Sequence, residues 1–193
     1  MRIPARNPTN IVLVFVSSGD DLAALRDLVW RLGMESINPV LREMKRSVRL
    51  DVDRWEHTPP HRVPEGQTLN SEFVTRARAA QLVVCLLHEK IGEGTREEIE
   101  AALDDDDVEL SVVWCVTRDD WPNTEVGQFL APLKDEIFID RAGLSGTDGP
   151  AVAIARILFQ ATLTADAQTP AGDDVRLAPS PASASEGLLR EQR

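Results

Sequence analysis

The chain has 193 residues, of which 42% are hydrophobic and 27% charged, a balance typical of one globular domain with a substantial core. Its formal net charge of −11 repels nucleic-acid phosphate and anionic lipid. No apolar run approaches the ~20 residues that span a bilayer, and the first residues lack the apolar core of a signal peptide. We therefore expect a cytoplasmic protein that binds neither nucleic acid nor membrane.

The two cysteines, Cys85 and Cys115, lie inside apolar runs. We expect both to be buried and reduced, with a disulfide between them as the lesser alternative. His57 and His61 flank two prolines, but no Cys or further His pair accompanies them at metal-ligand spacing. The sequence therefore predicts no metal site.

The first buried strand is predicted at residues 11–16, an unbroken apolar run that ends in the polar turn 17–21. A helix follows from Leu22, because apolar residues then recur at helical spacing, and Gly33 or Pro39 is expected to end or kink it. Residues 48–55 alternate between apolar and charged side chains, which indicates a half-exposed strand at a sheet edge. A loop with three prolines and a short helix that starts near Asn70 come next.

Residues 82–87 form a continuous apolar run that suits a strand buried on both faces. The polar loop 88–94 leads to a helix at residues 95–103. Thr95 is predicted as its N-cap, and Glu98 completes a capping-box pattern. The alternative is that a glutamate of this helix points into a ligand cleft at the end of the strand.

The remaining elements are a third buried strand at 110–116, a weak helix at 126–133, a short strand at 136–140 and a final helix at 152–163. Ala, Pro, Ser, Asp and Gly dominate residues 164–193, which we expect to be a disordered tail.

Strands alternate with helices five times, which predicts an α/β fold of the flavodoxin-like class, a three-layer sandwich around a parallel sheet. The polar strand 48–55 and the short strand 136–140 suit the edges, which gives the order 2-1-3-4-5. One domain is expected at residues 10–163, after a flexible arm at 1–9. A ligand should bind where the carboxyl ends of the first and third strands meet.

Ser17, Ser18 and Gly19 leave the first strand at this point. A glycine and two hydroxyls at a helix N-terminus suit an anion, but Asp20 and Asp21 already offset that helix dipole. Neither serine has a paired His nearby in the sequence that would make it a nucleophile. Hydrogen bonding to a ribose, or capping of the helix, is the expected role of both.

Three stretches resemble TIR-like domains. They are the strand end Val14-Phe15-Val16-Ser17-Ser18, residues 50–56 with Arg54-Trp55-Glu56, and residues 94–102, which begin Gly94-Thr95-Arg96-Glu97-Glu98. The third stretch is similar to the helix signature of a bacterial TIR-like family, and also to the Gly-Thr-x-x-Glu element of nucleoside 2-deoxyribosyltransferases. Together these stretches cover roughly residues 11–140, although the loop before Gly94 is shorter than in the family pattern.

The resemblance implies a TIR-like enzyme that splits the nicotinamide–ribose bond of NAD, with NAD as substrate and without a cofactor. By alignment on Gly94-Thr95, Glu98 takes the catalytic place and Glu97 is the fallback, whereas Glu100 should be a solvated surface residue. Trp55 could stack on a ring or be structural, and Asn70 could bond the substrate or cap its helix, with the cap favoured. The implied substrate-binding residues are Ser17, Ser18, Gly19, Trp55, Asn70 and His88.

Three functions remain open. The first is an NAD-cleaving effector in bacterial antiphage defence and signalling, triggered by self-association or by a partner protein. The second is a TIR-like scaffold that binds a nucleotide or a protein without turnover. The third is a hydrolase similar to nucleoside deoxyribosyltransferases. The first and third need a carboxylate in the cleft, whereas the second does not.

Overall fold

The computed structural model describes residues 10–53, 68–116, 123–143 and 149–168. These residues contain a five-stranded parallel sheet with the order β2-β1-β3-β4-β5, so the predicted fold class and strand order are confirmed. The strands are β1 (Asn10–Ser18), β2 (Val48–Asp53), β3 (Leu82–Leu87), β4 (Glu109–Val116) and β5 (Phe138–Gly143).

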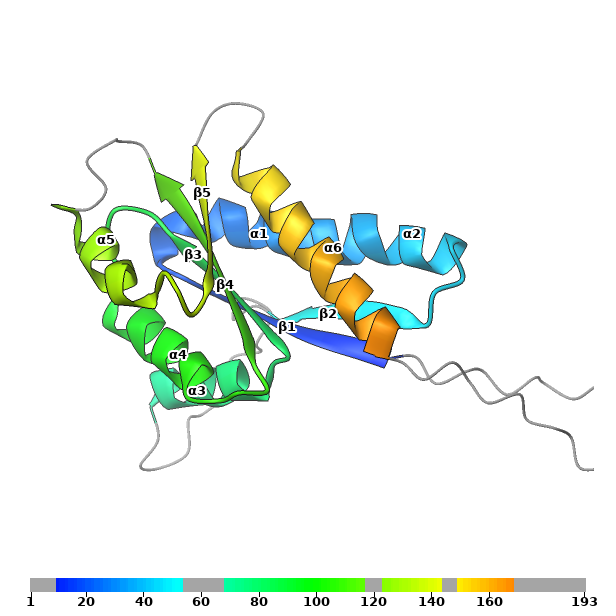
Figure 1. Cartoon of the computed structure of the whole chain (residues 1–193), viewed down its shortest axis with the longest axis horizontal. Helices are drawn as coiled ribbons and strands as arrows, with labels where there is room; N and C mark the ends of the chain where they lie inside the picture. Colours follow the sequence, from blue (N-terminus) through cyan, green and yellow to red (C-terminus); the bar gives the residue numbers. More distant parts are fainter. Residues whose placement is uncertain (1–9, 54–67, 117–122, 144–148, 169–193) are drawn as a thin grey trace, which may run out of the picture.

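Helices cover both faces of the sheet, which makes three layers (Figure 1). One face packs against α1 (Ala23–Arg31), α2 (Asn38–Glu43) and α6 (Pro150–Gln168). The other packs against α3 (Leu69–Ala79), α4 (Glu93–Leu103) and α5 (Glu125–Leu130). Short 3₁₀ turns lie at Asp20–Leu22 and Ala131–Leu133. Among the described residues, no helix has the length and apolar character needed to cross a bilayer.

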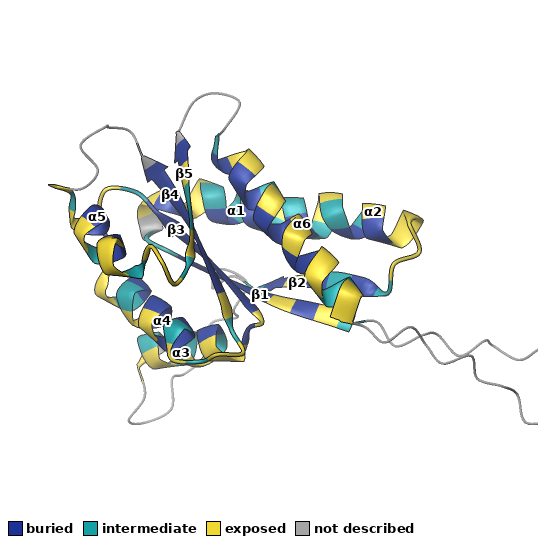
Figure 2. Cartoon of the chain, in the orientation of Figure 1, coloured by how far each residue is buried: buried dark blue, intermediate teal, exposed yellow. Residues whose placement is uncertain are grey.

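Burial follows the position of each strand in the sheet (Figure 2). All six residues of β3 are buried, because this strand lies centrally with helices over both faces. In β2, Val48, Leu50 and Val52 are buried whereas the residues between them are partly or fully exposed, as expected for an edge strand. The two patterns explain why one strand reads as a continuous apolar run and the other as an alternation.

The helix after β1 changes geometry near Gly33, one of the two positions at which an end or a kink was expected. α1 continues directly into a π-helical segment, Leu32–Ile37, and then into α2. A Cβ added to Gly33 would lie 2.7 Å from Cγ2 of Val52. The glycine therefore lets this segment approach β2 more closely than a larger residue would allow.

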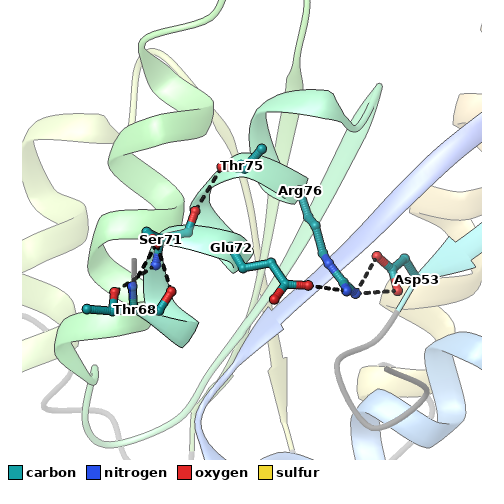
Figure 3. A network of polar contacts seen from close by, with 6 residues as sticks. All are labelled: Asp53, Thr68, Ser71, Glu72, Thr75 and Arg76. Atoms are coloured by element: carbon teal, nitrogen blue, oxygen red, sulfur yellow. Dashed lines mark hydrogen bonds and ion pairs between the residues drawn. The ribbon is translucent and has the colours of Figure 1, made fainter. Parts of the chain in front are cut away.

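The N-terminal end of α3 is capped by Thr68 (Figure 3). Oγ1 of Thr68 accepts a hydrogen bond from the backbone N of Ser71, and Oγ of Ser71 accepts one from the backbone N of Thr68, both at 3.1 Å. Further along α3, Arg76 bonds Glu72 on the same helix and Asp53 at the end of β2. The helix is thus tied to the edge strand that precedes it in the sequence.

The predicted capping box of α4 is wrong. The helix begins at Glu93, its N-cap is Gly92, and no side chain caps it. Thr95 is buried inside the helix. The Glu98 carboxylate accepts a hydrogen bond from Ser17 of β1 instead of bonding the N-terminus of its own helix. The local pattern fits a cap, but packing of the helix against the sheet starts it two residues earlier.

The predicted end of the domain at residue 163 needs correction, because α6 continues to Gln168. Asp166 forms an ion pair with Arg46 at 2.7 Å, and Nδ2 of Asn10 donates to the carbonyl of Ala165 at 3.3 Å. The last turn of α6 therefore belongs to the domain. The remainder of the predicted tail, the arm 1–9 and the motif around Trp55 lie outside the described residues.

Candidate functional site

Ser17 and Glu98 meet at the carboxyl end of the sheet. Ser17 is the penultimate residue of β1 and is 1% exposed, whereas Glu98 lies on α4, after β3, and is 7% exposed. Oγ of Ser17 donates a hydrogen bond to Oε2 of Glu98. Because β1 and β3 are adjacent in the sheet, the turn after one strand and the helix after the other converge at the predicted switch point.

Burial dominates the electrostatics of Glu98 and raises the pKa of its carboxyl group to about 7. The hydrogen bond from Ser17 opposes this rise, the charge of Glu97 adds to it, and the positive charge of Arg26 lowers it again. Near neutral pH the carboxyl group is therefore close to half ionised. A buried carboxyl group that titrates near neutrality beside a fixed donor is typical of functional sites.

The helical register separates the four glutamates of α4. Glu93, Glu97 and Glu100 are exposed, and only Glu98 of the four is buried against the sheet. The favoured role of Asn70 as a helix cap is wrong, because Thr68 is the N-cap of α3. Nδ2 of Asn70 instead donates a hydrogen bond to Oε2 of Glu97. A Cβ added to Gly94 would lie 2.5 Å from Oδ1 of Asn70, so this glycine makes room for the amide.

Ser18 and Gly19 are held by Arg26 of α1. Nη1 of Arg26 donates to Oγ of Ser18 at 2.7 Å and to the carbonyl of Gly19 at 2.6 Å. The side chain of Arg26 is 1% exposed. No motif in the sequence marks this residue, but its spacing is a signal, because Arg26 lies at helical spacing between the buried residues Leu22 and Val29. An arginine on the apolar face of a helix indicates a buried polar partner.

His88 directly follows β3 and is half-buried. Its Nδ1 lies 3.7 Å from Oδ2 of Asp21, and its backbone carbonyl accepts a hydrogen bond from Nε1 of Trp114 at 3.0 Å. Nε2 of His88 is buried without a hydrogen-bond partner within the described part of the chain. The imidazole therefore brings a polar group to the same end of the sheet as Ser17 and Glu98.

Both cysteines are free and buried, as predicted. Cys85 on β3 is the register partner of Ser17, and burial together with the charge of Glu98 raises the pKa of its thiol well above the usual range. Burial and the charge of Asp21 raise the pKa of Cys115 to about 11. Both thiols are protonated and unreactive at neutral pH. No group of three or more His, Cys, Asp or Glu residues in the described ranges is arranged to hold a metal ion.

Two cavities lined by described residues lie outside the region where Ser17 meets Glu98, which we call the Ser17–Glu98 junction. One, of about 410 Å³, lies beside β2 and is lined by residues that include Asp53, Arg76 and Trp30. The other, of about 370 Å³, lies between α5 and the strands β4 and β5 and includes Trp114 and Arg141. Trp114 connects the second cavity to the junction region through its bond to the carbonyl of His88.

No family model and no curated protein matches the chain. Similar solved structures include the heterodimer of the RPS4 and RRS1 TIR domains, at 12% identity over 80% of this chain and 99% of that chain, with a TM-score of 0.45. A putative quinone reductase from Klebsiella pneumoniae matches at 9% identity over 79% and 85% of the chains, with a TM-score of 0.43. A flavodoxin-like domain from Synechococcus sp. matches at 11% identity over 80% and 96%, with a TM-score of 0.36. These likenesses assign neither a family nor an activity, and the fold class rests on the observed strand order.

Proposed function

We propose that the chain is a TIR-like enzyme that splits the nicotinamide–ribose bond of NAD, with Glu98 as its catalytic carboxylate. The observation that carries the proposal is the buried Glu98, held by Ser17 where β1 and β3 end. The Gly-Thr-x-x-Glu stretch and the strand end with its two serines, which resemble TIR-like domains, are the segments that meet there. The helix register favours Glu98 over the exposed Glu97 for this role.

The chemistry needs one negative group close to the ribose. The bond from ribosyl C1′ to the pyridinium nitrogen breaks, its electron pair stays on nitrogen, and nicotinamide leaves as a neutral molecule without a general acid. The ribosyl carbon becomes cation-like, and the carboxylate of Glu98 stabilises that charge. Water then adds to C1′, which gives ADP-ribose and one proton. Only the ionised form of Glu98 serves this role, so turnover should rise with pH through about 7.

The other residues of the junction position the substrate. The hydroxyl groups of Ser17 and Ser18 and the backbone of Gly19 face the ribose in this proposal, and the substrate hydroxyls compete with Ser17 for the Glu98 carboxylate. Asn70 acts through Glu97, which it bonds. The His88 imidazole, whose Nε2 has no hydrogen-bond partner among the described residues, offers a further hydrogen bond.

A binding function without turnover is the second candidate. It is favoured by the raised pKa of Glu98, because at neutral pH much of this group is protonated and its carboxylate is already engaged by Ser17. A site of this kind binds a ribose or nucleotide without strong charge stabilisation. A nucleoside hydrolase would use the same carboxylate on a neutral substrate. Cleavage of nucleosides without cleavage of NAD would separate it from an NAD-cleaving enzyme.

The test is nicotinamide release from NAD by the purified chain at high protein concentration. A parallel sample is fused to an oligomerising partner, because the family resemblance implies that self-association or a partner protein completes the site. We expect Glu98→Gln to lower turnover by about 10²-fold or more, because Gln keeps the size but loses the negative charge. Glu100→Gln is the matched control on the exposed face of the same helix and should keep full activity.

Three results would contradict the proposal. If the assembled wild type releases no nicotinamide but binds NAD, the scaffold function replaces it. If the protein cleaves purine nucleosides or deoxynucleosides and not NAD, the nucleoside hydrolase replaces it. If Glu98→Gln is as active as the wild type, Glu98 is not the catalytic group.

A further inference from the structure

Arg26 is a buried charge in the apolar layer between α1 and the sheet. Its side chain is 1% exposed and lies among the buried residues that α1 presents to the sheet. Burying an unpaired guanidinium group is strongly unfavourable, so its contacts must compensate. These contacts include the turn that follows β1, at the edge of the candidate site.

The contacts hold that turn at two points. Nη1 of Arg26 donates to Oγ of Ser18 and to the carbonyl of Gly19, and the same carbonyl accepts a hydrogen bond from the backbone N of Leu22 at 3.2 Å. A Cβ added to Gly19 would lie 2.8 Å from Oδ1 of Asp21, so the glycine leaves space for this carboxylate beside the turn. A change in the shape of the turn would pass directly to Ser17, the preceding residue.

Ser17 connects the turn to the carboxylate. Its Oγ donates to Glu98, so the position of β1's last residues sets where this donor lies. We propose that Arg26 is a positioning residue, which anchors the turn at Ser18 and Gly19 and thereby holds Ser17 against Glu98. This inference rests on the proposed function for its meaning in catalysis, but not for its test.

The charge of Arg26 acts in the same direction as its geometry. Its positive charge and the hydrogen bond from Ser17 both lower the pKa of Glu98, against the effects of burial and of Glu97. Cys85 on β3 also faces the carboxylate, but burial keeps its thiol protonated and neutral. Removal of Arg26 should therefore raise the pKa of Glu98 for two reasons: its positive charge is lost, and the hydrogen bond from Ser17 is weakened.

The test replaces Arg26 by Met, Lys or Gln in the full chain. Arg31→Met is the matched control, because Arg31 lies on α1 with an exposed side chain and pairs only with the exposed Asp27 among the contacts described. The carbon-13 signal of the Glu98 carboxyl group, assigned by its loss in Glu98→Gln, gives the pKa without any turnover. Hydrogen exchange of the Leu22 amide reports on the turn.

We expect Arg26→Met to raise the pKa of Glu98 by about half a unit or more, which is roughly a threefold change in its proton affinity. Exchange at the Leu22 amide should become about tenfold faster, as expected when a hydrogen bond to a charged group is lost. Arg26→Lys, which keeps the charge and can donate to two acceptors, should restore most of both values. Arg31→Met should change neither.

The NAD assay adds a separate readout. If NAD is cleaved, Arg26→Met should lower kcat more than it raises KM, and the rise of activity with pH should move to higher pH with the Glu98 titration. If wild type shows no cleavage, the proposed function fails, but the titration still decides the role of Arg26.

Equal Glu98 titration and equal Leu22 exchange in wild type and Arg26→Met would overturn the inference. Arg26→Gln decides it in the same way if the Met variant does not fold, because Gln places a polar amide at this buried position but is shorter than Arg and carries no charge. A change in Arg26→Lys as large as in Arg26→Met would also overturn it, since general damage to packing would then explain both.

Discussion

The buried Glu98 carboxyl group should make the stability of the protein depend on pH in a way that its Gln variant does not. Its pKa is about 7 in the folded chain against the ordinary value of 4.5, so the folded state binds this proton more tightly than the unfolded state. The stabilising contribution is therefore fully present below about pH 4.5 and is lost as pH rises through about 7.

The size of the effect follows from the two pKa values. The rise of the pKa from 4.5 to about 7 lowers the free energy of unfolding by roughly 3 kcal/mol in the limit of high pH. Between pH 5 and pH 8 the loss is about 2.5 kcal/mol, because part of it has already occurred at pH 5. The small exposed fraction of Glu98 leaves little solvent screening to reduce this figure.

The assay is urea unfolding of wild type and Glu98→Gln at pH 5 and pH 8. All other titrating groups are shared, so they cancel in the difference between the two proteins. We expect the stability of the Gln variant relative to wild type to increase by about 2 to 3 kcal/mol from pH 5 to pH 8. Glu100→Gln, which changes an exposed glutamate of the same helix, should show no such increase. If the difference between wild type and Glu98→Gln does not change with pH, the carboxyl group is not desolvated and the geometry proposed for the site is wrong.

Two further predictions concern packing at positions that the sequence analysis singled out. Gly33→Ala should lower the free energy of unfolding by about 1 to 3 kcal/mol, because its Cβ would lie 2.7 Å from Val52. Gly92→Ala is the control and should cost less, because no described atom lies within 4 Å of its added Cβ. An equal loss for the two variants in urea titrations would contradict this reasoning. From the composition of the tail alone, deletion of residues 165–193 should leave the melting temperature nearly unchanged. The contacts of Ala165 and Asp166 with the domain predict a loss instead. Deletion of 169–193 should leave the melting temperature nearly unchanged, whereas deletion of 164–193 should lower it by a few degrees; equal melting temperatures for the two truncations would show that the last turn of α6 adds nothing.

The architecture could be predicted because it depends on patterns that repeat along the chain. The continuous apolar run of β3 and the alternation of β2 each reflect how many faces of a strand are covered, and this determined their places in the sheet. The convergence of Ser17 with the helix after β3 followed from the strand order alone. The change of helix geometry near Gly33 also has a local signal, since glycine weakens a helix wherever it occurs.

Only the tertiary structure decided which side chains act together. Glu97 and Glu98 are neighbours in the sequence, but on a helix they point about 100° apart, and the packing of α4 against β1 selects Glu98. Thr95 fits a cap by its local pattern, yet the helix starts earlier because its contacts with the sheet outweigh a capping bond. Arg26 reads as an irregularity on an apolar helix face, and its partners became known only when β1 and α1 were placed side by side. Hydrophobic periodicity records burial along one element, whereas a hydrogen bond between distant residues depends on how two elements are placed in space.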